Sequence, residues 1–158
     1  MTMAPPVAQT AMLIRRPMAD VYEAIVDPAI TAKFWFTKGS NRLDSSELVT
    51  WEWEMYGATA KVRVLEIEAN ARILMDWGDL DTDPGTRVEW IFTELDPERT
   101  FIDVSDRNFT GTDDEQIAKA LDSTGGFALV LAGLKAWLEH GLQLNLVGDR
   151  FPADATSH

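Results

Sequence analysis

Bulky apolar side chains occupy every second position in three stretches of the chain. In the first stretch, Trp51, Trp53 and Met55 alternate with Glu52 and Glu54. The same spacing recurs at Met75 and Trp77, and at Trp90 and Phe92. Alternate residues of a β-strand point to one face, so this pattern predicts strands that are apolar on one side and polar on the other. A sheet built from such strands needs a cover over its apolar face.

Turn residues divide the centre of the chain into consecutive strands. Short connections such as Gly57 and the Asp-Pro-Gly sequence at 83–85 favour antiparallel neighbours over helical crossovers. The apolar positions change phase between Val64 and Leu65, which predicts a β-bulge. The polar segment 37–46 is expected to be a loop. About six strands are expected, over residues 7–16, 47–56, 58–69, 72–77, 86–95 and 100–109.

Two short helices are expected between the first two strands. Apolar residues of segment 18–26 recur three and four positions apart, as on one face of a helix. Asp27 and Pro28 suit the N-cap and the first position of a second helix, over 28–34. The aromatic residues at its end, including Trp35, should point inward or line an opening.

A long helix is expected near the end of the chain. Thr112 and Glu115 fit a capping box, which opens a helix reaching about residue 146. Its apolar stripe includes Phe127, Leu131 and Leu134. Two consecutive glycines at 125–126 predict a kink or a close approach to another backbone.

The area of the sheet face can be compared with the area that this helix covers. Six strands about 20 Å long and about 4.8 Å apart present roughly 550 Å² of face. A helix of about 20 residues covers only about 300 Å² of that face. We therefore expect the sheet to curve around the helix and the short helices to close one end. The remaining gap would form a pocket lined by the inner-face aromatic residues.

Several segments resemble a known family. Residues 21–28, VYEAIVDP, followed by Trp35, are similar to the first helix of the START-like SRPBCC superfamily, and specifically of the domain named after activators of the heat-shock-protein-90 ATPase. Residues 72–77 resemble its central strand, and residues 126–139 its C-terminal helix. The resemblance implies an α+β helix-grip fold, in which a curved antiparallel sheet wraps around the long C-terminal helix. Relatives use the enclosed cavity for lipids, hormones, polyketides and other hydrophobic molecules.

Length and composition limit the classes of partner. The 158 residues fit one domain, with a core over about 7–146 and flexible ends. A formal charge of −12 argues against nucleic acid and anionic membranes, which attract basic proteins. No stretch looks long and apolar enough to cross a bilayer, and no secretory signal is evident. The chain has no cysteine, so disulfides and thiolate chemistry are excluded, and we expect a cytoplasmic protein.

The leading hypothesis is a carrier, sensor or sequestration protein for a small hydrophobic molecule, aromatic or lipid-like. Apolar burial would supply the affinity, and polar groups at the end of the last strand would set the orientation. Alternation from Ile102 and Val104 would turn Asp106 and Asn108 toward the cavity. The expected ligand-binding residues are Trp35, Trp51, Trp53, Met55, Met75, Trp77, Trp90, Phe92, Asp106, Asn108, Phe127, Leu131 and Leu134.

Two alternatives stay open. One is an enzyme similar to polyketide cyclases or aromatases, with Asp106, Tyr56 and Asn108 as candidate proton-transfer groups. The other is a chaperone-associated module that binds a partner through an exposed apolar patch. A chaperone partner is not expected, because 158 residues leave no room for the separate chaperone-binding domain of the eukaryotic activator.

No cofactor and no metal are expected from the sequence. The acidic residues at 79, 81 and 83 begin like a calcium-binding loop, but the sixth position is Pro84 and the twelfth is Trp90. A calcium loop needs Gly and Glu at those positions, so an acidic hairpin is the better interpretation. The sequence leaves a homodimer open.

Overall fold

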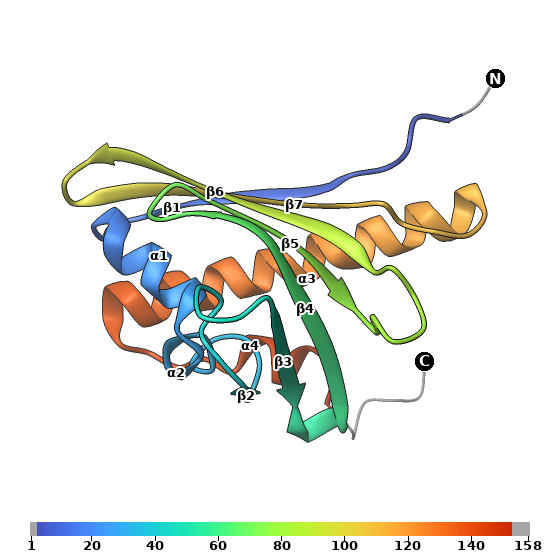
Figure 1. Cartoon of the computed structure of the whole chain (residues 1–158). Helices are drawn as coiled ribbons and strands as arrows, with labels where there is room; N and C mark the ends of the chain where they lie inside the picture. Colours follow the sequence, from blue (N-terminus) through green and yellow to red (C-terminus); the bar gives the residue numbers. More distant parts are fainter. Residues whose placement is uncertain (1–2, 153–158) are drawn as a thin grey trace.

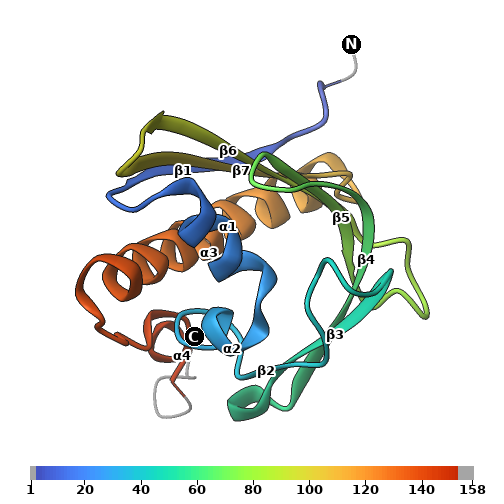
Figure 2. The same cartoon turned by 60° about the vertical axis from the view of Figure 1, so that its left-hand side comes forward.

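An antiparallel sheet of seven strands curls around one long helix in the computed structural model, which describes residues 3–152 (Figures 1 and 2). The strand order is β1-β7-β6-β5-β4-β3-β2. The strands are β1 (Ala8–Ile14), β2 (Lys38–Gly39), β3 (Leu48–Trp53), β4 (Ala58–Glu68), β5 (Arg72–Gly78), β6 (Thr86–Asp96) and β7 (Arg99–Arg107). The helices are α1 (Met18–Val26), α2 (Pro28–Thr31), α3 (Asp113–His140) and α4 (Leu146–Arg150), and a 3-10 turn spans Glu54–Tyr56.

This architecture confirms the expected α+β helix-grip fold, with two short helices between the first strand and the rest of the sheet. The seventh strand was not predicted. It is β2, a two-residue edge strand within the segment expected to be a loop, and it pairs Lys38 with Glu52 and Gly39 with Trp51. Two residues are too few to show an alternating pattern, so the sequence carries no periodic signal for β2.

The predicted β-bulge is confirmed in β4. The pairing with β5 shifts register between Val64 and Glu66, which leaves Leu65 without a partner. Such a bulge bends its strand and increases the local twist. The sheet therefore turns at β4, and β3 and β4 curl around one side of the molecule rather than extending the plane of β5–β7 (Figure 2).

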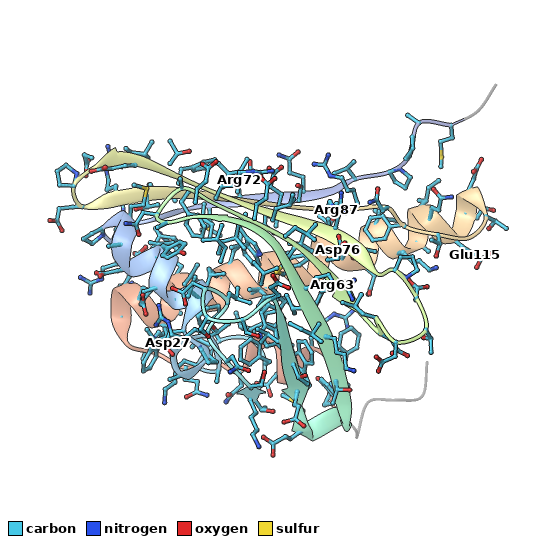
Figure 3. The ribbon with its side chains drawn as sticks, in the orientation of Figure 1. Asp27, Arg63, Arg72, Asp76, Arg87 and Glu115 are labelled. Carbon is cyan, nitrogen blue, oxygen red and sulfur yellow. The ribbon has the colours of Figure 1, made fainter. Side chains whose placement is uncertain are left out.

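The alternation of the strands separates a charged outer face from an apolar inner face. On the outer face, Arg87 pairs with Asp76 at 2.9 Å, and Arg72 pairs with both Glu66 and Glu89 at 2.5 Å (Figure 3). On the inner face lie fully buried side chains from β3, β5, β6 and β7, among them Trp51, Ile73, Met75, Val88, Trp90, Ile102 and Val104. Helix α3 covers this face with Phe127, Val130, Leu131 and Leu134.

Helix α3 begins at the predicted capping box. The Thr112 hydroxyl accepts from the backbone N–H of Glu115 at 3.2 Å, and the Glu115 carboxylate accepts from the N–H of Thr112 at 3.3 Å. The helix ends at His140, earlier than the expected residue 146. Gly141 adopts a left-handed conformation with φ of 65°, and this C-cap closes the helix.

The chain then forms α4, which the sequence did not predict. Residues 1–2 and 153–158, where flexible ends were expected, lie outside the described part of the chain.

Helix α3 is long and apolar enough, by length and composition, to cross a bilayer. This differs from the expectation drawn from the sequence. The core helix of a globular protein meets the same criteria. Phe127, Leu131 and Leu134 of α3 are buried between the helix and the curled sheet.

The glycine pair at 125–126 neither interrupts α3 nor admits another backbone. The helix is continuous through both residues, and a methyl group on either would meet no atom within 4 Å. The close approach occurs instead at Gly133. A Cβ there would lie 3.0 Å from Phe34 Cβ and 3.2 Å from the Phe34 carbonyl oxygen.

Alanine at these two sites is expected to have opposite effects on stability. Gly125→Ala should raise the free energy of unfolding by about 0.5–1 kcal/mol, because it restricts the unfolded chain and meets no obstacle. Gly133→Ala should lower it, because the Phe34 backbone must move to admit the methyl group. Urea unfolding of both variants measures the difference, and equal gains would contradict the assigned contact.

Candidate functional site

An open cavity of about 740 Å³ lies between the N-terminal half of α3 and the end of the sheet formed by β4, β5 and β7. The loop between β5 and β6 and the α4 segment complete its rim. Pockets of about 300–1,000 Å³ are typical of sites for small organic molecules. The cavity is therefore large enough to enclose such a molecule.

Four aromatic side chains from four different segments form the apolar wall of the cavity. Trp35 follows α2, Trp53 ends β3, Trp77 lies in β5, and Phe127 lies in α3. The ring of Trp35 is 5.5 Å from those of Trp77 and Phe127, and 6.3 Å from that of Trp53, between centroids. Most of these contacts are edge-on, the arrangement that the aromatic quadrupole favours. The rings form one connected surface with Trp35 at its centre.

Other inner-face residues expected to bind ligand lie in the packed core and do not line the cavity. The structure places Trp51, Met75, Trp90, Phe92, Leu131 and Leu134 there. The position of Trp35 explains why these residues lie in the core rather than at the cavity wall. Its ring packs 4.8 Å from Trp51 and 5.8 Å from Trp90, so Trp35, rather than these two residues, faces the cavity.

Met55 and Tyr56 lie outside the cavity as well, because β3 ends at Trp53. The 3-10 turn that follows breaks the alternation, and Met55 is 50% exposed. The Tyr56 hydroxyl donates to the carbonyl oxygens of Val147 and Gly148, at 3.0 and 2.9 Å. Tyr56 therefore anchors α4 at the rim instead of contributing a group to the interior.

The end of β7 brings two polar residues to the cavity, Asp106 and Asn108. Asp106 follows the inward positions of Ile102 and Val104 and is only 2% exposed. Asn108 comes after the strand and adopts a left-handed conformation with φ of 71°. It lies at the exposed edge of the cavity.

Asp106 is held by one hydrogen bond to α3. Its Oδ2 accepts from the hydroxyl of Ser123 at 2.8 Å, whereas Oδ1 has no hydrogen-bond partner among the described residues. Burial raises the pKa of the Asp106 carboxyl above its ordinary value, and nearby polar side chains of Thr86, Ser123 and Trp77 oppose that rise. Burial dominates because it penalises the charged form of a carboxyl group.

Sequence reasoning missed the contribution of α3 to the polar side of the cavity. Lys119, Asp122 and Ser123 line it together with Gly126 and Phe127. A signal was present, because Ser123 precedes Phe127 by four residues and therefore shares its helical face. The α4 segment adds Val147, Arg150 and Phe151, and no local pattern marked these residues.

Carboxylates outnumber basic groups around the cavity. The lining includes Asp79, Asp83, Asp106 and Asp122, against Lys119 and Arg150. The Lys119 ammonium donates to the carbonyl oxygen of Thr110 at 2.8 Å. In residues 3–152, no group of three or more His, Asp or Glu side chains is placed to hold a metal ion.

Comparison with known families identifies this architecture. The model of the family described as "Activator of Hsp90 ATPase homolog 1-like protein" matches residues 15–139. No curated protein matches the sequence.

Solved structures similar to this chain share its whole fold. Protein SSP2350 from Staphylococcus saprophyticus is 27% identical, with a TM-score of 0.74 over 88% of this chain and 96% of its own. DynU16, from the dynemicin biosynthetic locus, is 20% identical, with a TM-score of 0.74 over 87% of this chain and 48% of its own. The Aha1 dimer from Colwellia psychrerythraea is 17% identical, with a TM-score of 0.70 over 86% of this chain and 98% of its own.

Proposed function

The chain belongs to the Activator of Hsp90 ATPase homolog 1-like family of the START-like SRPBCC superfamily, and we propose that this member binds a small hydrophobic molecule with aromatic character. The observation that carries the proposal is the 740 Å³ cavity with Trp35, Trp53, Trp77 and Phe127 on one wall. Preformed aromatic surfaces of this kind bind flat ligands by stacking and by burial of apolar area.

A carrier or sensor role fits the chemistry of the lining better than catalysis. Asp106 and Ser123 are hydrogen-bonded to each other, but His140, the one histidine among residues 3–152, does not line the cavity. Binding requires only the aromatic wall and one or two orienting polar groups. The proposed role is therefore to hold a molecule rather than to transform it.

An enzyme similar to polyketide cyclases is the second candidate, and Asp106 is the observation that favours it. A buried carboxyl with a raised pKa at the wall of a cavity is suited to general acid–base chemistry. Asn108 could assist at the edge, whereas Tyr56 is engaged with α4 and does not line the cavity. Loss of turnover with retained binding in Asp106→Asn would favour this candidate over a carrier.

A homodimer is a further proposal, motivated by the Aha1 structural neighbour, which is a dimer. Sedimentation equilibrium of the full chain tests it, and a monomer at all concentrations would overturn it.

Filling the cavity from α3 should weaken ligand binding with little effect on the fold. Gly126 lines the cavity, whereas the adjacent Gly125 does not, and both have open space where a Cβ would lie. Gly126→Leu should therefore reduce affinity for two-ring aromatic compounds at least about tenfold, since a Leu side chain would occupy ligand volume. Quenching of tryptophan fluorescence during titration measures the affinity.

Gly125→Leu is the matched control, because it makes the same helix-favouring change one position away. It should retain the affinity of the parent chain. If no compound in a panel of aromatic and lipid-like molecules binds the parent, the proposed function is wrong. Equal loss of binding in both variants would instead contradict the location of the site.

A further inference from the structure

Asp106 is an unusual group to bury at the wall of an aromatic cavity. It is 2% exposed, and its Oδ1 is one of only two buried side-chain polar atoms in residues 3–152 that lack a hydrogen-bond partner; the other is Trp90 Nε1. Trp90 lies in the core, whereas Asp106 lines the cavity. Unsatisfied buried groups are rare in folded proteins and call for a specific explanation.

The neighbouring basic side chains do not neutralise Asp106. Lys119 donates to the Thr110 carbonyl oxygen, and the Arg150 guanidinium lies 4.4 Å from the centroid of the Phe151 ring. Neither forms an ion pair with Asp106 within the described part of the chain. The side chains that interact with the carboxylate are neutral: Ser123 donates to Oδ2 at 2.8 Å, and Thr86 and Trp77 lie close enough to lower its pKa.

The other charged residues that line the cavity also favour a positively charged ligand. Asp79, Asp83 and Asp122 add negative charge around the cavity, which attracts cations and repels anions. Trp35, Trp53 and Trp77 line the cavity as well, and indole is the aromatic side chain that interacts most strongly with an ammonium group. A buried carboxylate among tryptophan rings is the combination that recognises a protonated amine.

We propose that the ligand of this cavity is an aromatic amine, whose protonated nitrogen pairs with Asp106 while its ring system packs against the tryptophan and Phe127 rings. The inference rests on the proposed function and specifies its ligand class. A carboxylate ligand would meet a buried like charge. A neutral hydroxyl would supply a donor to Oδ1, but it would leave the negative charge of the cavity without a counterion.

Four naphthalenes that share one ring system and differ in one substituent test this proposal. They are 1-naphthylmethylamine, which is cationic, 1-naphthylmethanol and 1-methylnaphthalene, which are neutral, and 1-naphthylacetate, which is anionic. Calorimetric titration of the full chain at neutral pH should rank the amine first, about 10-fold to 100-fold tighter than the alcohol, as expected for a hydrogen bond to a charged group. The acetate should bind most weakly.

Asp106→Asn should remove the preference for the amine over the alcohol while leaving the affinity for 1-methylnaphthalene unchanged. Asp103→Asn is the matched control, because it removes a carboxylate of the same strand, β7, that does not line the cavity, and it should keep the preference. Circular dichroism checks that both variants fold. If Asp106→Asn does not fold, Ser123→Ala, which removes the partner of Oδ2, should change the preference in its place.

Each result decides between the two proposals. If the parent chain binds the four naphthalenes equally, or binds the acetate best, the amine inference is overturned and the proposed function stands. A preference that survives in Asp106→Asn, or that is lost equally in Asp103→Asn, also overturns the role of Asp106. If none of the four compounds binds, the proposed function fails, and the inference fails with it.

Discussion

Replacing Trp51 by alanine is expected to lower the free energy of unfolding by about 3–5 kcal/mol, as for other large side chains removed from packed cores. Trp51 is 1% exposed. Its ring stacks on Phe36 and meets Trp35 edge-on, both at 4.8 Å between centroids. The substitution would leave a cavity between β3 and the segment after α2, which the surrounding rings cannot close without moving. Urea unfolding followed by circular dichroism measures the loss.

Trp77→Ala is the matched comparison, because Trp77 also lies on the inner face but is partly exposed and lines the cavity. It should cost less stability, about 1–2 kcal/mol, and should weaken binding of aromatic ligands about tenfold through lost stacking. If Trp51→Ala yields no folded protein, Trp51→Phe provides a smaller loss in the same direction. A larger stability loss in Trp77→Ala than in Trp51→Ala would contradict the division between core and cavity.

Asp106→Asn is expected to stabilise the protein at neutral pH by about 1–3 kcal/mol, because it removes a buried carboxylate charge that no cation balances. The pKa of Asp106 is raised by burial. Its folded-state pKa therefore exceeds its unfolded-state pKa, and the parent chain loses stability as pH rises between these two values. The gain in Asp106→Asn should be absent below that window, where the parent carboxyl is protonated, and complete above it. Thermal unfolding of both chains from pH 3 to pH 8 measures this dependence.

Asp44→Asn is the control for which the opposite change in stability is expected. A hydrogen bond from Arg42 lowers the pKa of Asp44, so its charged form is favoured in the folded state. The variant should be less stable than the parent at neutral pH, and the difference should disappear as pH falls through the lowered pKa. If Asp106→Asn loses stability at neutral pH in the same way, the carboxylate of Asp106 is satisfied in the fold, and the unpartnered Oδ1 is not a binding group.

The sequence by itself determined six of the seven strands, the long helix and the bulge. Alternation at Trp51 and Trp53 reflects the pleat of one strand, and the capping box at Thr112 and Glu115 reflects bonds within one turn of helix. The change of phase at Leu65 marked the bulge in β4. These features depend on residues a few positions apart, so their physical causes are contained in short segments of chain.

The composition of the site was only partly accessible from the sequence. Asp106 and Phe127 were expected to face the cavity, and they line it. Ser123 was missed although it shares a helical face with Phe127. The segment 146–151 carried no signal at all, because α4 has five residues and its position depends on the hydrogen bonds of the Tyr56 hydroxyl.

Only the tertiary structure decided which inner-face residues form the core and which face the cavity. Trp35 reaches the sheet from the segment after α2 and packs against Trp51 and Trp90, which removes both from the cavity wall. Asp106 and Ser123 meet only because β7 and α3 pack together. Alternation fixes the side of the sheet on which a residue lies. What covers that residue depends on contacts between distant segments, and no local pattern of hydrophobic and polar positions records those contacts.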